Sequence, residues 1–211
     1  MSDHRVYEHV IKRIIDIMGS LLAVIVLSPV YIVMLILEYS LHGKPAMYNS
    51  IRSGKDCKPF ELLKFRSMTN ETDENGNLLP NEKRLTRFGR FIRKTSLDET
   101  PEFINILKGD MSFIGPRPMP MEYIPLYSEY HLRKQKVRPG LACPRLKKTN
   151  TYPTWDEQFD NEAWYADHVS LSVDIRMAIA LVQTVFNRKK ATVRGNATRG
   201  KFTGSIESGG K

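Results

Sequence analysis

Residues 17–37 read IMGSLLAVIVLSPVYIVMLIL and contain no charged side chain. A run of about 20 apolar residues can span a bilayer core about 30 Å thick. A cleaved signal peptide would have a shorter apolar run followed by a small-x-small cleavage site, which does not follow here. A buried core helix would normally show a polar face, and this segment shows none. The segment therefore predicts a helix inserted in a membrane.

Ser28 and Pro29 lie in the middle of this segment. Proline removes a backbone donor and clashes with the carbonyl four residues earlier, so a helix kinks or breaks there. A serine hydroxyl can bond a freed carbonyl, which makes the break tolerable in lipid. Basic residues mark the cytoplasmic side of a membrane segment, and here they flank both ends. A re-entrant helix would keep both flanks inside, whereas a kinked spanning helix would not; charge and proline alone leave both open.

The net charge of +9 is concentrated at the carboxyl end of the 211 residues. Residues 188–211 hold seven basic residues and one acid, which is +6 of the total. Their scarcity of apolar side chains predicts a disordered tail, attracted to anionic lipid headgroups. A nucleic-acid surface needs a basic patch on a folded domain, so no nucleic-acid partner is expected.

The cysteines and histidines form none of the familiar site motifs. Cys57 and Cys143 lie far apart and in no CxxC, so they predict neither a disulfide scaffold nor a zinc site. The five histidines form no HExxH, and no GxGxxG or complete P-loop occurs. A histidine metal site and a P-loop nucleotide site are therefore not expected.

The residues after the apolar segment predict short strands and then a helix. Residues 45–70 have strand and turn character and would place Lys64 and Arg66 on one strand face, for which spacing alone favours solvation. Residues 70–81 are polar and predict an exposed loop. Residues 82–94 show helical periodicity, with arginines that wind around one side. Those arginines are Arg84, Arg87, Arg90 and Arg93.

Two carboxylates, Asp98 and Glu99, stand side by side in TSLDETPE at 95–102. Ser96-x-x-Glu99 fits a capping box, and Thr100 followed by proline fits a helix N-cap. Either arrangement puts the acids where the helix dipole favours negative charge, and spacing alone favours this structural role.

The same stretch also suits chemistry on a phosphate. An ionised carboxylate at a helix amino terminus is ready to act as a nucleophile or as a Mg²⁺ ligand. Aspartate can attack phosphorus to form an acyl phosphate. Arginine neutralises phosphate oxygens through paired hydrogen bonds, and Arg117 is held between two prolines in the sequence GPRP.

In their order along the chain, these pieces resemble the bacterial monotopic phosphoglycosyl transferases, also called bacterial sugar transferases. The resemblance covers roughly residues 5–185 and is most specific from Leu97 to Pro118. We expect the minimal catalytic form, which lacks the extra amino-terminal membrane domain of larger members. The motifs that carry the resemblance are the break at Ser28-Pro29, KFRSM at 64–68, SLDE at 96–99, NxLKGDMSFxGPRP at 105–118 and VRPG at 137–140.

The resemblance implies an enzyme that moves a sugar-1-phosphate from a UDP-sugar to a membrane polyprenyl phosphate and releases UMP. It implies a ping-pong mechanism in which Asp98 attacks the phosphate bearing the sugar and forms a covalent phosphosugar enzyme. Mg²⁺ is expected at Asp98 and Glu99, with Glu99 supporting the metal or proton handling. Arg93 and Arg117 match positions expected to bind phosphate, and Lys64 is a weaker match.

The resemblance also implies a re-entrant first helix with both ends cytoplasmic, on the bacterial inner membrane. The expected fold is α+β and mainly helical, with short strands and interfacial amphipathic helices. Its parts would be a membrane-inserted helix with its flanks at 1–43, a cytoplasmic catalytic domain at 44–187 and the basic tail at 188–211. Membrane lipid and other glycan-assembly enzymes are expected partners; the sugar, the pathway and the oligomeric state are left open.

One loop departs from the family pattern. After VRPG the family commonly continues Ile/Leu-Thr-Gly-Trp-Ala-Gln-Val, whereas residues 141–147 read LACPRLK. The family's sugar or uridine contacts in that loop are therefore not expected at residues 141–147.

The last apolar region is 155–187. Its aromatic residues Trp155, Phe159, Trp164 and Tyr165 are candidates for anchoring at the headgroup level. An apolar face follows, for which core packing is expected and partial membrane insertion is the alternative. That face consists of Leu171, Ile175, Ala178, Ile179, Val182 and Phe186.

A non-catalytic membrane adaptor is the alternative function. Its basic tail and helices would recruit anionic lipid or a partner enzyme. The acid pair near Arg93 and the GPRP loop argue against it.

Overall fold

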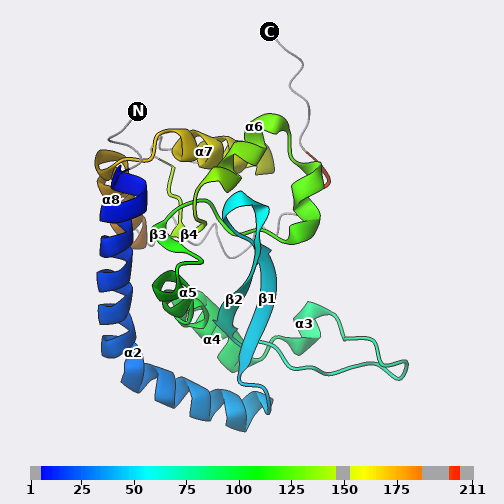
Figure 1. Cartoon of the computed structure of the whole chain (residues 1–211). Helices are drawn as coiled ribbons and strands as arrows, with labels where there is room; N and C mark the ends of the chain where they lie inside the picture. The colour runs from blue at the N-terminus through cyan, green and yellow to red at the C-terminus, as the bar shows by residue number, and fades with distance from the viewer. Residues whose placement is uncertain (1–5, 146–152, 187–199, 205–211) are drawn as a thin grey trace.

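The computed structural model describes residues 6–145, 153–186 and 200–204, and within them the chain is mainly helical with two small sheets. The prediction of a mainly helical α+β fold is confirmed. In Figure 1 the helix α2 runs along one side and beneath a domain built from the other elements. In chain order these elements are η1 (Tyr7–Ile11), α2 (Lys12–His42), β1 (Met47–Ser53), η2 (Lys55–Cys57), β2 (Pro59–Phe65), α3 (Asn81–Arg84), α4 (Arg87–Thr95), η3 (Leu97–Glu99), α5 (Glu102–Lys108), β3 (Ser112–Ile114), η4 (Met121–Leu126), α6 (Glu129–Leu132), η5 (Arg133–Lys136), β4 (Gly140–Ala142), α7 (Trp155–Asp167) and α8 (Leu171–Phe186).

The break predicted at Ser28 and Pro29 is a bend inside one helix, since α2 continues through the proline. Figure 1 shows the two halves of α2 running in different directions. Pro29 has no amide hydrogen for the carbonyl of Ile25, four residues earlier. Ser28 Oγ donates to this same carbonyl at 2.7 Å, so the predicted compensation by serine is confirmed. The side of the membrane on which each end of α2 lies stays a prediction.

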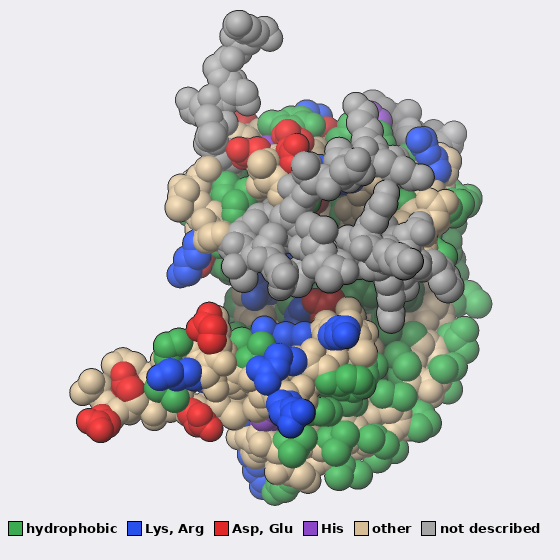
Figure 2. Space-filling view, turned by 180° about the vertical axis from the view of Figure 1, so that it is seen from behind, with side chains coloured by type: hydrophobic (Ala, Val, Ile, Leu, Met, Phe, Trp, Pro, Cys, Tyr) green, Lys and Arg blue, Asp and Glu red, His purple; other side chains and the backbone are tan. Residues whose placement is uncertain are grey.

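Most apolar side chains of α2 are uncovered. Among the described residues, η1 and α2 together form the one helix that is long and apolar enough to cross or anchor in a membrane. Leu22, Val26 and Ile36 are among its exposed side chains. In Figure 2, which is viewed from behind, hydrophobic side chains cover much of the side on which α2 lies. An apolar surface of this extent is compatible with membrane association.

The amino-terminal half of α2 is fixed to the domain by buried polar contacts. Lys12 Nζ donates to Asp174 Oδ2 on α8 at 2.6 Å. Asp16 Oδ1 accepts hydrogen bonds from Ser112 Oγ at 3.0 Å and from the backbone nitrogen of Phe113 at 3.1 Å, both on β3. Charged residues on a membrane helix are costly unless they are paired, so these contacts define the side of α2 that faces protein.

The predicted strands form an antiparallel hairpin, β1 with β2, which confirms the strand and turn prediction for 45–70. The polar loop at 70–81 is largely exposed as expected and carries an isolated bridge between Thr72 and Leu78. The expectation of a solvated face at Lys64 and Arg66 is wrong: the Lys64 side chain is only 19% exposed, and the difference is larger for Arg66. That residue is buried, and its guanidinium donates to the carbonyls of His42, Pro45 and Met68.

The single helix predicted over 82–94 is wrong, because the chain forms α3 and α4 with a break between them. Leu85 pairs with Met68 in an isolated bridge. Thr86 then caps α4, its Oγ1 accepting from the backbone nitrogen of Gly89 at 2.8 Å. Threonine is a favoured N-cap residue, so Thr86 is a local signal for a helix start. The prediction missed it because it followed the spacing of the apolar residues. His42 Nε2 lies 2.9 Å from Thr86 Oγ1, which ties this cap to the end of α2.

The two glycine-containing motifs meet in a parallel pair, β3 with β4. Ser112 lies opposite Gly140, and the backbone nitrogen of Gly140 donates to the carbonyl of Pro116 at 2.8 Å. A Cβ atom on Gly115 would lie 2.6 Å from the carbonyl oxygen of Arg138, and one on Gly140 would lie 2.1 Å from the nitrogen of Gly115. Only glycine permits this approach, so the GPRP and VRPG motifs are two sides of one contact.

The expectations for the last two helices are partly wrong. Phe159 and Tyr165 on α7 are fully buried and do not lie at a surface. On α8 the buried side is formed by Val173, Asp174 and Met177. The face predicted to pack in the core is instead exposed, wherever its side chains are described; those residues are Leu171, Ile175, Ala178, Ile179 and Val182. The prediction considered only the apolar side chains and did not include the buried carboxylate of Asp174, which determines the orientation of α8.

Most of the tail predicted at 188–211 lies outside the described residues, but residues 200–204 are described. Phe202 is only 4% exposed, so the expectation of disorder is wrong at this residue. It packs into what we call the aromatic cluster. This cluster consists of Met119, Tyr123, Tyr127, Phe159 and Phe202.

Candidate active site

Asp98 and Glu99 lie on η3, a short 3₁₀ turn between α4 and α5. Ser96 before it has φ 58°, in the left-handed region, and its side chain makes no cap hydrogen bond with the described residues. Helix α5 begins after Pro101, and Thr100 Oγ1 donates backward to the carbonyl of Leu97 at 2.8 Å. Neither predicted cap therefore forms, although the helix itself does. A capping role does not account for the acids.

Basic side chains from two distant segments meet at Glu99. Lys64 Nζ, from β2, lies 2.7 Å from Glu99 Oε1, and Arg117 Nη2 lies 3.7 Å from the same oxygen. Lys64 Nζ also lies 3.1 Å from Glu102 Oε1, on the first turn of α5. The structure thus brings together Lys64, Glu99 and Arg117, three of the predicted site residues.

Asp98 is partly buried. Burial, followed by the charge of Glu99, raises the pKa of Asp98 above its ordinary value, while Lys64 and Arg93 oppose the rise. We expected a helix terminus to keep this carboxylate ionised, and burial has the opposite effect. An additional cation beside Asp98 would favour the ionised form.

Arg93 lies in the last turn of α4. Its charge acts on Asp98, and its Nε donates to Ser67 Oγ at 2.8 Å. Ser67 belongs to the KFRSM motif, so this motif orients Arg93 as well as supplying Lys64. Arg93 thus acts on Asp98, whereas Arg117 lies closest to Glu99 among the described ion pairs.

A hollow beside Glu99 joins these groups. Its charged lining includes Arg52, at the end of β1, and Glu102, which the sequence analysis did not single out. In the sequence, both residues look like ordinary surface positions of a strand or a helix. Glu102 nevertheless follows Glu99 by three residues, which puts the two side chains on the same face of the turn. Asp98 itself does not line the hollow. The lining consists of Arg52, Leu62, Lys64, Glu99, Glu102, Arg117, Pro118, Met119, Gly140 and Leu141.

The acid pair fits a magnesium ion only if the substrate supplies further ligands. Among the described residues, no group of three or more His, Cys, Asp or Glu could hold a metal. Mg²⁺ is commonly bound by one or two carboxylates together with water and substrate phosphates. Asp98 and Glu99 offer two carboxylates, and within the described residues the ion pairs of the site are made by Glu99 and Glu102 and not by Asp98.

Comparison with known proteins identifies the family of this chain. The family model described as bacterial sugar transferase matches residues 7–188. "Uncharacterized sugar transferase EpsL" of Bacillus subtilis (strain 168) is 36% identical over 93% of this chain and 97% of its own length. "UDP-glucose:undecaprenyl-phosphate glucose-1-phosphate transferase" of Klebsiella pneumoniae is 33% identical, over 86% of this chain and 41% of its own. "Undecaprenyl-phosphate galactose phosphotransferase" of Salmonella typhimurium is likewise 33% identical, over 86% and 41%.

The chain thus spans nearly all of the Bacillus relative and about two fifths of the other two. The matched region contains the membrane-type helix, the acid pair and the GPRP loop. The resemblance drawn from the sequence motifs is therefore confirmed, and the chain belongs to the bacterial sugar transferase family.

Proposed function

We propose that this chain transfers a sugar-1-phosphate from a UDP-sugar to a membrane polyprenyl phosphate and releases UMP. The observation that carries the proposal is the convergence of Lys64 and Arg117 on Glu99, next to the desolvated Asp98. The names of two relatives, which specify undecaprenyl phosphate as the acceptor, support this reaction class. Those names specify different sugars, glucose and galactose, so the sugar is left open.

In the proposed mechanism a carboxylate oxygen of Asp98 bonds to the phosphorus that carries the sugar. The phosphoanhydride bond breaks, and its electron pair leaves with UMP. An oxygen of polyprenyl phosphate then bonds to the same phosphorus, and Asp98 leaves as a carboxylate. Both steps move an already ionised oxygen, so neither requires a proton to be removed from the nucleophile.

The basic residues of the site would neutralise the phosphates during these steps. Arg117 and Arg52 both line the hollow, where they can reach the oxygens of the diphosphate. Arg93, whose charge favours the ionised form of Asp98, would neutralise the phosphate under attack. Mg²⁺ held by Asp98 and Glu99 would supply charge neutralisation to the phosphates.

We infer that the membrane arrangement brings the acid pair to the lipid substrate. A re-entrant α2 would keep both its ends, and the catalytic domain, on the cytoplasmic face of the inner membrane. On its buried side, α8 is bound to α2 through the ion pair between Asp174 and Lys12. Its opposite, apolar face is exposed, which supports a position of α8 at the membrane interface. Tyr31 Oη on α2 donates to the carbonyl of Thr100 at 2.8 Å, so the bent helix directly contacts the chain beside the acids.

A panel of UDP-sugars, with polyprenyl phosphate, Mg²⁺ and detection of UMP, tests the proposal. At least one UDP-sugar should give UMP, and Asp98→Asn should abolish the release because an amide is a poor nucleophile and ligand. A chain that binds anionic vesicles but releases no UMP from any sugar in the panel would favour the membrane adaptor instead.

A further inference from the structure

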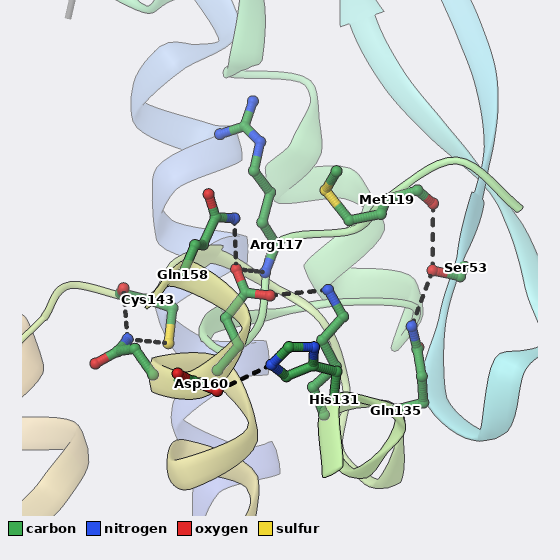
Figure 3. Close-up of polar contacts among 11 residues, drawn as sticks. Ser53, Arg117, Met119, His131, Gln135, Cys143, Gln158 and Asp160 are labelled. Carbon is green, nitrogen blue, oxygen red and sulfur yellow. Dashed lines mark hydrogen bonds and ion pairs between the residues drawn. The ribbon is translucent and has the colours of Figure 1, made fainter. Parts of the chain in front are cut away.

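The loop that carries Arg117 is held at both of its ends by buried polar groups (Figure 3). The backbone nitrogen of Arg117 donates to Glu162 Oε1 on α7 at 3.2 Å. The carbonyl of Met119 accepts from the backbone nitrogen of Ser53 at 2.9 Å and from Ser53 Oγ at 3.2 Å. Gln135 Nε2 donates to Ser53 Oγ in turn, at 3.2 Å. The backbone at 117–119 is therefore fixed from two directions.

Glu162 is the more unusual of these anchors because it is a carboxylate only 1% exposed. Its Oε2 accepts from Lys134 Nζ on η5 at 2.9 Å, and its Oε1 accepts from Gln158 Nε2 at 2.8 Å in addition to Arg117. Lys134 is also 1% exposed, and its Nζ lies 3.9 Å from the centre of the Phe159 ring. Both carboxylate oxygens of Glu162 thus accept hydrogen bonds, Oε2 from the buried Lys134 and Oε1 from Gln158 and the Arg117 backbone.

Stability alone does not explain this ion pair. Burial lowers the pKa of Lys134, with Glu162 opposing, which reflects the cost of removing the charge from water. A buried ion pair is often replaced by apolar residues of similar volume with no loss of stability. What an apolar pair could not do is accept the hydrogen bond from the backbone of Arg117.

We propose that Glu162 is a positioning residue for Arg117, and that Lys134 orients the carboxylate of Glu162 for this purpose. The inference rests on the proposed function, in which Arg117 binds a phosphate of the nucleotide sugar. The Arg117 side chain is 59% exposed, and Figure 3 shows it extending away from Asp160. A long exposed side chain has few contacts to fix it, so the anchored backbone determines where its guanidinium can reach.

Two matched double variants isolate the hydrogen bond to Arg117. Lys134→Met with Glu162→Gln removes both buried charges but keeps an oxygen that can accept from the Arg117 amide. Lys134→Met with Glu162→Leu also removes both charges, at similar volume, but leaves no acceptor. Melting temperatures of both are measured first, so that they are compared at a temperature at which both are folded.

We expect the leucine variant to show a KM for the UDP-sugar about fivefold to tenfold above that of the glutamine variant, with a smaller change in kcat, as the loss of one hydrogen bond implies. The affinity for UDP, measured by calorimetry without turnover, should fall by a similar factor. Equal KM values and equal UDP affinities in the two variants would overturn the inference.

The same pair of variants is then compared in an Arg117→Ala background. If Glu162 acts through Arg117, the difference in UDP affinity disappears there, because coupled residues are not additive. A difference that persists without the Arg117 side chain would show that Glu162 acts by another route and would contradict the inference. An inactive wild-type chain would instead count against the proposed function, so the two failures are distinguishable.

Discussion

Lys64 and Glu99, which are 35 positions apart in sequence, form an ion pair with 2.7 Å between Nζ and Oε1. The contact joins the β1–β2 hairpin to the turn that carries the acids. Lys64 also reaches the buried Glu102, so one ammonium group serves two carboxylates. Lys64 therefore organises the acid side of the site, in addition to any contact it makes with a phosphate.

Removing this ammonium group should affect both stability and activity. In Lys64→Met, Glu102 loses its cationic partner while only 4% exposed, which we expect to cost about 1–3 kcal/mol of the free energy of unfolding. Lys64→Arg keeps the charge and serves as the control. Thermal denaturation and UMP release of the three chains check the prediction, and a fully stable, fully active methionine variant would contradict it.

The pH dependence of kcat/KM should reflect the raised pKa of Asp98. Because the nucleophile must be ionised, activity is lost as the pH falls through that raised pKa, so the acidic limb should lie above the ordinary aspartate value of about 3.9. Glu99→Gln removes one cause of the rise and should move the limb of the residual activity to lower pH. Increasing the Mg²⁺ concentration should move it the same way if the ion binds the pair. A limb that responds to neither change would argue against this assignment.

The topology of α2 can be tested at its two ends. Single cysteines at Ser2 and Asn49, in a chain without its native cysteines, should both react with an impermeant maleimide in inside-out vesicles. Neither should react in intact spheroplasts, because the re-entrant arrangement keeps both flanks cytoplasmic. Pro29→Ala restores an amide donor for Ile25 and should favour a straight, spanning helix. Labelling of the two wild-type ends from opposite sides would refute the re-entrant topology.

Phe202 should contribute to stability although it lies near the carboxyl terminus. It is buried against Tyr123, Tyr127 and Phe159, and its backbone nitrogen donates to Tyr123 Oη at 3.2 Å. Phe202→Ala should lower the melting temperature, with about 3–5 kcal/mol as the upper bound for the lost side chain. Phe202→Leu should lower it less. An alanine variant with the wild-type melting temperature would mean that the segment does not dock in solution.

Local rules in the sequence identified much of this site. Pro29 and Ser28 both affect the carbonyl of Ile25, within one helical turn, so the bend and its compensation by serine could be predicted without knowing the fold. The GPRP and VRPG motifs contributed only to the family resemblance, and the close backbone contact between their glycines was found in the fold. The acids and Arg117 were found through the family motifs, since spacing alone favoured a helix cap that does not form.

The residues that were missed depend on distant packing. Arg52 enters the hollow because β1 ends beside the GPRP loop, and Glu162 reaches Arg117 from 45 positions away. The exposed face of α8 was misassigned for the same reason. Its orientation follows from Asp174, whose partner Lys12 lies 162 positions earlier in the sequence. No periodicity within a helix reports such a partner.

The central claim, that Asp98 is the nucleophile, is tested most directly by intact mass spectrometry after a single turnover without polyprenyl phosphate. With a UDP-sugar from which the chain releases UMP, the wild-type chain should gain the mass of one sugar phosphate and release one equivalent of UMP. Asp98→Asn should do neither, and polyprenyl phosphate added afterwards should remove the adduct from the wild-type chain. An adduct that persists on Asp98→Asn, or UMP release that always requires polyprenyl phosphate and leaves no adduct, would contradict the account.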